Sequence, residues 1–152
     1  MAVIAYRMES RAAIVARPIY LLLFPIPVVC FIAALLTDIA YSASALLMWL
    51  HFSQWLIAAG LVVGALAALV LLFEFFASGA IRASGAGWVH LVLFYAALVV
   101  ELFNAFVHTV DGYTAVVPKG MWLSIIGVIL ALAAVAALFF VPVAWSGREV
   151  RR

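Results

Sequence analysis

The chain has 152 residues, of which 71% are hydrophobic and only 9% are charged, and its mean hydropathy is +1.36. A soluble domain is about 45–50% apolar and about 25% charged, so this composition argues against a soluble enzyme, a disordered chain and a disulfide scaffold. The net charge is +2, and the few basic residues form no patch beside aromatic side chains, which argues against nucleic-acid binding. The composition therefore predicts an integral membrane protein.

Four apolar stretches follow one another along the chain, and each could form a membrane-crossing helix, which needs about 20 residues. Turn-forming residues separate them. We predict an all-α, polytopic membrane protein, an up-down bundle of four transmembrane helices. The predicted helices cover about residues 18–41, 46–76, 88–108 and 120–145, within a membrane domain of residues 17–145, between an N-terminal segment of residues 1–16 and a tail of residues 146–152.

The basic residues predict the orientation of the bundle, because Lys and Arg concentrate in cytoplasmic segments. With both termini in the cytoplasm, seven of the 8 basic residues lie inside and only Lys119 lies outside. Within the second helix, Gly60 and Gly64 are one turn apart, a spacing that allows helices to approach closely. This pair could serve packing within the bundle or contact between two copies, and we favour packing.

Polar side chains inside the predicted helices need an explanation, because a charge at the bilayer centre costs roughly 2.5–3.5 kcal/mol on insertion scales. Asp38 lies near the outer end of the first helix, Glu74 near the inner end of the second, and Glu101 in the outer half of the third. At about 100° per residue, six residues of the third helix share one face, which should point into the bundle. They are His90, Phe94, Ala97, Glu101, Asn104 and His108.

The up-down topology places these polar residues in two groups, one at each side of the membrane. The predicted outer group consists of Asp38, His51, Glu101, Asn104 and His108, and the inner group of Glu74, His90, Arg82, Arg17 and Tyr20. Simpler explanations stay open for the outer group. Asp38 could be a helix-end residue that reaches interfacial water, and His51 and His108 could be interfacial histidines.

The two glutamates also have simpler explanations. Glu74 could form a salt bridge with Arg82 or Arg17 at the inner interface. Glu101 could be a neutral carboxylic acid that is hydrogen-bonded to Asn104, one turn away, without any further function.

The three histidines are the candidate cofactor ligands, because histidine is a common axial ligand of haem. His90 and His108 point the same way but lie about 27 Å apart along the helix axis, so they cannot hold one haem together. Only His51 and His108 lie at the same predicted level. We predict no metal site and no catalytic residues, since the sequence contains no GxGxxG, Walker, CxxC or HExxH pattern.

Several short motifs stand out within or beside the apolar helices. They are Arg17-Pro18-Ile19-Tyr20-Leu21, Phe24-Pro25-Ile26-Pro27, Thr37-Asp38, Glu74, Ala86-Gly87-Trp88-Val89-His90 and Asn104. In these motifs the chain resembles the bacterial four-span membrane proteins grouped as domain of unknown function 2231, over about residues 17–140. The resemblance implies a four-helix fold in the bacterial cytoplasmic (inner) membrane and does not imply an activity.

The chain departs from the pattern of that family in two places. The family opens with His-Pro-Ile-His-Pro, whereas Arg17 and Tyr20 stand in place of the two histidines here, and the family's Gly-Gly-Glu-Leu-Val ending is absent. The inner histidines of the family look able to bind a haem or a metal, and only His90 remains in this chain. The resemblance therefore implies a divergent member that keeps the scaffold and lacks such a site.

These observations favour a non-catalytic membrane protein that acts as an accessory or structural subunit of a larger membrane complex. Its predicted partners are lipid and other membrane subunits or further copies of itself, and we do not expect an enzyme. Two alternatives stay open. One is an electron carrier with b-type haem, and the other is a proton- or ion-linked channel or transporter centred on Glu101, with Asp38, Asn104 and His108 along its path.

Overall fold

The computed structural model describes residues 18–110 and 113–141, and within these residues it contains helices and no strand. The elements are α2 (Pro25–Ser44), α3 (Leu47–Ala77), α4 (Gly79–Ala83), α5 (Gly85–His108), the 3-10 helix η1 (Tyr113–Ala115) and α6 (Lys119–Leu138). Residues 18–23 are also helical and continue through a turn at Phe24 into α2. Four segments are long and apolar enough to cross a membrane, and the first of them is Pro18–Ser44. The predicted all-α fold with four spans is thus confirmed.

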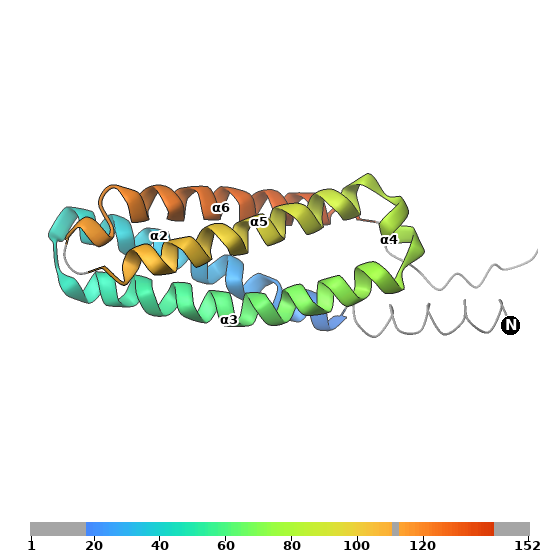
Figure 1. The fold of residues 1–152 in the computed structure, drawn as a ribbon, viewed down its shortest axis with the longest axis horizontal. Coiled ribbons are helices and arrows are strands. Elements are labelled where there is room, and N and C mark those ends of the chain that lie inside the picture. The colour runs from blue at the N-terminus through green and yellow to red at the C-terminus, as the bar shows by residue number, and fades with distance from the viewer. Residues whose placement is uncertain (1–17, 111–112, 142–152) are drawn as a thin grey trace, which may run out of the picture.

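The four long helices lie side by side along the long axis of the molecule (Figure 1). α5 packs most extensively on α6 and α2 on α3, while α3 also contacts α5 and α2 contacts α6. These contacts close a ring in the order α2, α3, α5, α6. The connection from α2 to α3 and the helix η1 lie at one end of the bundle, which we call the Asp38 end, and α4 lies at the other, which we call the His90 end (Figure 1).

Three helix boundaries differ from the sequence prediction by three residues or more, and the first of them is the end of α2, at Ser44 rather than at residue 41. α5 begins at Gly85 rather than at residue 88, because the Ser84 hydroxyl caps the helix by accepting a hydrogen bond from the backbone N–H of Gly87 at 2.9 Å. α6 ends at Leu138 instead of continuing to residue 145. The sequence supplies a reason, since Pro142 has no N–H to donate to the carbonyl of Leu138. The predicted segments 1–16 and 146–152 lie outside the described residues.

Glycines let α3 approach its neighbours closely. A Cβ atom added at Gly60 would lie 2.6 Å from the Phe31 ring of α2, and one added at Gly64 would lie 2.5 Å from Cδ2 of Leu98 on α5. In a membrane, an apolar side chain gains little free energy when it moves from lipid into a contact between helices. Membrane helices therefore commonly pack through small residues, which allow close approach. The prediction that this pair serves packing within the bundle is therefore confirmed.

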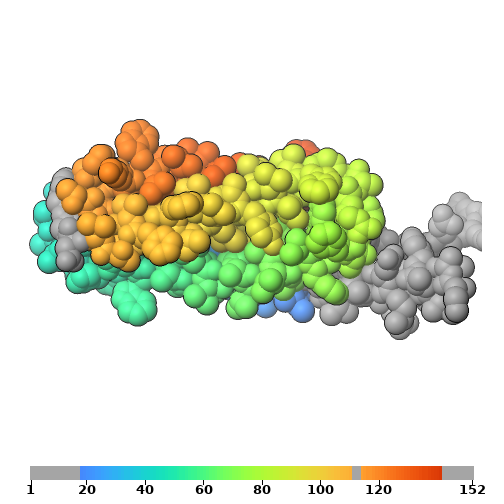
Figure 2. All heavy atoms as spheres, in the orientation of Figure 1, coloured from blue at the N-terminus to red at the C-terminus, as the bar shows by residue number. Residues whose placement is uncertain are grey.

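The outer surface of the bundle is apolar on every long helix. Large hydrophobic side chains are exposed there, and they include Leu22, Leu36, Trp55, Leu69, Phe106, Trp122 and Ile129. Figure 2 shows bulky side chains projecting from one face formed by α3, α5 and α6. A soluble protein rarely exposes apolar patches of this extent, so this surface contacts the lipid of the membrane.

Candidate functional site

The polar interior of the bundle lies along the seam between α5 and α6. The buried face of α5 contains all six residues that the helical period predicted. α6 meets this face with small residues, namely Gly120, Ser124, Gly127, Ala131 and Ala134. A Cβ atom added at Gly120 would lie 2.8 Å from Cε1 of His108, and one added at Gly127 would overlap the Glu101 carboxyl group. The two glycines therefore provide the space that the two polar side chains occupy.

Asp38 is the hub of a hydrogen-bond network at its end of the bundle. Its Oδ1 accepts a hydrogen bond from Oγ of Ser53 at 2.5 Å and lies 3.0 Å from Nε2 of His108. Its Oδ2 accepts from Oγ of Ser124 at 2.5 Å. Because Ser53 is on α3, His108 on α5 and Ser124 on α6, this one carboxyl group of α2 bonds to all three of the other long helices. Asp38, Ser53, His108 and Ser124 are all 0% exposed.

The hydrogen bonds of His108 define its chemistry. Its Nδ1 lies 3.0 Å from the backbone oxygen of Asn104, and since a carbonyl oxygen can only accept, Nδ1 carries a proton. Its Nε2 faces a carboxyl oxygen of Asp38 that already accepts from Ser53. An ionised Asp38 with a protonated His108 satisfies all three contacts, so the geometry favours a buried ion pair. Nε2 of Gln54 also donates to the backbone oxygen of His108 at 2.5 Å.

The network extends from Asp38 to Glu101 through two intermediate side chains. Nδ2 of Asn104 donates to Oγ of Ser124 at 2.8 Å and to Oε2 of Glu101 at 3.0 Å. Two buried oxygens, Oε1 of Glu101 and Oδ1 of Asn104, have no hydrogen-bond partner among the described residues. Both side chains are 0% exposed. Unpaired buried acceptors are uncommon in native structures and require an explanation.

The structure brings together four of the five residues of the predicted outer group: Asp38, Glu101, Asn104 and His108. The predicted hydrogen bond between Glu101 and Asn104 is present. The alternative in which Asp38 reaches interfacial water is wrong, because its side chain is completely buried, and the His108 side chain is buried in the bundle as well. His51 does not join the group. It is exposed in the first turns of α3, since the buried stripe of that helix runs through Leu50, Ser53 and Ile57.

Four neutral side chains belong to the network although the sequence analysis did not predict them as members. They are Thr37, Ser53, Gln54 and Ser124. The hydroxyl of Thr37 lies 2.7 Å from Oγ of Ser53 and donates back to the carbonyl of Ala34 at 2.8 Å. The sequence does contain a pattern that could have predicted the role of Ser124. Gly120, Ser124 and Gly127 recur at helical spacing on α6, and a stripe of small residues marks the side of a helix that packs against another helix.

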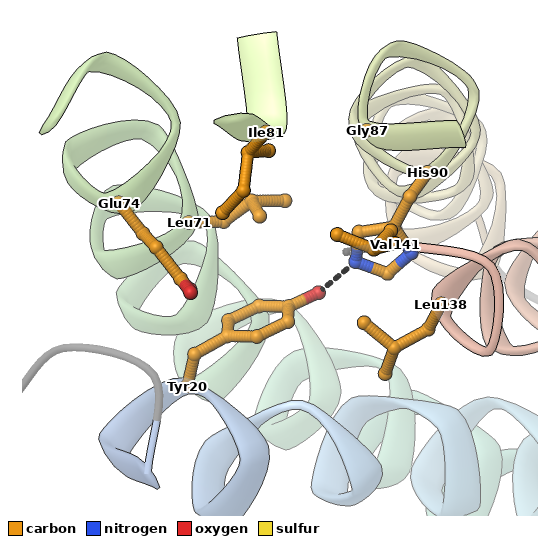
Figure 3. A pocket seen from close by; sticks show the side chains of 8 residues that line it. All are labelled: Tyr20, Leu71, Glu74, Ile81, Gly87, His90, Leu138 and Val141. Atoms are coloured by element: carbon orange, nitrogen blue, oxygen red, sulfur yellow. Dashed lines mark hydrogen bonds between the residues drawn. The ribbon is translucent and has the colours of Figure 1, made fainter. Parts of the chain in front are cut away.

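A second polar group lies at the His90 end, around a small cavity (Figure 3). Nδ1 of His90 lies 2.8 Å from the backbone oxygen of Ala134, so this nitrogen is the protonated one. Its Nε2 therefore accepts the hydrogen bond that the Tyr20 hydroxyl donates at 2.5 Å. The cavity offers about 10 Å³ to the centre of a water molecule, which is room for about one water. Glu74 lines it and is buried.

Of the two predicted salt-bridge partners of Glu74, the structure describes only Arg82. Nη1 of Arg82 donates to the backbone oxygen of Phe76. Arg17, the other predicted partner, lies outside the described residues. The Glu74 carboxyl points into the cavity toward Tyr20 (Figure 3), so it belongs to the inner polar group as predicted.

The Tyr20–His90 hydrogen bond gives a stability prediction. We expect Tyr20→Phe to lower the free energy of unfolding by about 1 kcal/mol, because the buried Nε2 of His90 then loses the hydrogen bond that the Tyr20 hydroxyl donates. Detergent-induced unfolding of the purified protein measures this change. In a His90→Leu background, Tyr20→Phe should cost clearly less. Equal costs in the two backgrounds would contradict the assigned hydrogen bond.

The two polar groups are separated by an apolar layer. Between them lie the rings of Phe24 and Phe94, whose centroids are 5.1 Å apart, together with Ala97 and Ala131. Each of these four side chains is at most 3% exposed. Hydrogen bonds among the described side chains do not continue through this layer, so the groups at the two ends are chemically separate in this conformation.

Both buried histidines use both ring nitrogens in hydrogen bonds, His90 with Tyr20 and Ala134, and His108 with Asp38 and Asn104. A haem or metal ligand needs a free nitrogen lone pair, so ligation would require one of these bonds to break. Among the described residues, no group of three or more His, Cys, Asp and Glu side chains is placed to hold a metal ion.

Comparisons with known proteins place the chain by its sequence. No curated protein and no solved structure matches it. The family model described as "Predicted membrane protein (DUF2231)" matches residues 16–151. This match covers nearly the whole chain, including all four membrane-crossing helices and both polar groups. The chain therefore belongs to the DUF2231 family of predicted membrane proteins.

Proposed function

We propose that this integral membrane protein is a non-catalytic accessory or structural subunit of a larger membrane complex. The observation that carries the proposal is that most of the buried polar side chains are engaged in hydrogen bonds within the bundle. Asp38, Ser53, His108 and Ser124 bind one another across all four long helices, and His90 is held between Tyr20 and Ala134. Side chains that are hydrogen-bonded in this way fix helix register and leave few groups for chemistry.

The apolar layer between the two polar groups also supports this proposal over a channel. Phe24, Phe94, Ala97 and Ala131 fill the middle of the bundle, and a proton or ion would have to cross this layer at a high desolvation cost. The haem alternative has less support, because ligation by His90 or His108 would break a hydrogen bond and His51 lies outside the buried groups.

The proposal includes an orientation and a location. We place both termini in the cytoplasm, in the bacterial inner membrane, because seven of the 8 basic residues then lie on the cytoplasmic side. In this orientation the His90 end, with Arg82, faces the cytoplasm, and the Asp38 end, with Lys119, faces outward.

Site-specific photo-crosslinking in native membranes tests the subunit proposal. A photoreactive amino acid replaces one exposed residue on each long helix in turn, at Leu36, Trp55, Phe106 and Ile129. A stable subunit contact predicts crosslinks to one defined partner protein from one or two neighbouring helices and to lipid alone from the others. Crosslinks to lipid alone from all four positions, at native expression level, would overturn the proposal.

A further inference from the structure

The strongest unexplained feature is the pair of buried oxygens beside the α5–α6 seam. Oε1 of Glu101 and Oδ1 of Asn104 are both acceptors, both are on side chains that are 0% exposed, and neither has a partner among the described residues. Oε1 lies against Gly127, where an added Cβ atom would overlap the carboxyl group. A buried acceptor without a donor costs free energy of folding. A bound cation, or a proton on one of the two oxygens, would remove this cost.

The charges around Glu101 are already balanced without it. The titratable groups that face this region are Asp38 from α2 and His108 from α5, and these two pair with each other at 3.0 Å. The polar residues contributed by α3 and α6 are neutral, namely Ser53, Gln54 and Ser124. No Lys or Arg of the described chain pairs with Glu101. An ionised Glu101 would therefore be a buried charge without a counter-charge, which is strongly unfavourable.

We propose that Glu101 is a proton-binding site, a neutral carboxylic acid that carries its proton on Oε1. The hydrogen bond from Asn104 fixes which oxygen is protonated. Oε2 accepts from Nδ2 of Asn104 at 3.0 Å, so Oε2 is the carbonyl oxygen and Oε1 is the hydroxyl. A proton on Oε1 turns one of the two unpaired acceptors into a donor. Oδ1 of Asn104, one helical turn away, is an acceptor for it, directly or through one water molecule.

This site is independent of the subunit role. It assigns to Glu101 a bound proton that can be exchanged, whether the protein acts alone or in a complex. The ligand of the site is the proton. The competing occupant is a monovalent cation such as sodium, which could be coordinated by the same two oxygens, Oε1 of Glu101 and Oδ1 of Asn104.

Infrared spectroscopy of the whole purified protein in lipid nanodiscs tests the proposal. At neutral pH we expect the carbonyl-stretch band of a neutral carboxylic acid, which moves to lower frequency in heavy water. The band should disappear in Glu101→Gln, which keeps the size of the side chain, and remain in Glu74→Gln at the other end of the bundle. A wild-type spectrum without this band, or a band that survives in Glu101→Gln, would overturn the proposal.

A second variant tests the assignment of the oxygens and keeps the carboxyl group in place. Asn104→Ala removes the hydrogen bond to Oε2, so the carbonyl-stretch band should persist and move to higher frequency. A band that does not move overturns the assignment of Oε2 as the carbonyl oxygen. Loss of the wild-type band on adding sodium at constant pH would overturn the proton as the occupant of the site in the presence of sodium and would assign a cation site instead.

Discussion

Replacing Asp38 by leucine is expected to lower the free energy of unfolding by about 3–5 kcal/mol, the usual cost of removing one partner of a buried ion pair. The reason is that three donors lose their acceptor at once, from Ser53, His108 and Ser124. The Ser53 hydroxyl can turn to the carbonyl of Ala34, 3.2 Å away, but a protonated His108 would remain a buried charge without its counter-charge. Reversible unfolding in mixed detergent micelles measures the change.

The double variant Asp38→Leu with His108→Leu is the control for this prediction. Replacing both members of a buried ion pair by apolar residues is often close to neutral. The double variant should therefore be more stable than Asp38→Leu alone, although it contains one more substitution. If the two losses simply add, the contact between these side chains does not contribute as an ion pair.

Gly127→Val should lower the free energy of unfolding by an amount near the upper end of the about 1–3 kcal/mol that overpacking costs. A Cβ atom at this position overlaps the Glu101 carboxyl group, and valine adds two methyl groups to it. The carboxyl group must then leave its position against α6 and disturb its hydrogen bond to Asn104. The same unfolding measurement applies.

Two further variants separate this steric effect from the change in helix propensity. Gly85→Val is the matched control, because an added Cβ atom at Gly85 has no neighbour within 4 Å. It should change stability little. Glu101→Ala should restore much of the stability lost in Gly127→Val, since it removes the side chain that collides. A failure of this rescue would mean that Gly127 is required for another reason.

The sequence predicted the four spans and the buried face of α5 because both depend on local patterns. Apolar length defines a span, and a period of 3.6 residues placed Glu101, Asn104 and His108 on one face. The burial of Asp38 could not be predicted from a local pattern. Near the end of a predicted helix, an aspartate looks like a residue at the interface, and its burial becomes apparent only when Ser53 and Ser124 are known to face it.

The misplacement of His51 has the same origin. The level of His51 along the bundle was predicted by topology, but its direction depends on which face of α3 is buried. α3 is apolar all round, so its hydrophobic pattern did not distinguish the buried stripe through Leu50, Ser53 and Ile57 from the exposed side. Small and hydroxyl side chains at helical spacing would have been the better guide on both α3 and α6.

The position of Asp38 has a consequence for how the chain is made. Of the four membrane-crossing helices, the one that contains Asp38 is synthesised first, and its partners His108 and Ser124 follow 70 and 86 residues later. Until then, only Ser53 of the second helix is available to it. The Asp38 carboxyl group therefore has its full set of partners only after α6 has been synthesised. Formation of the complete Asp38 network is therefore coupled to synthesis of the chain as far as α6.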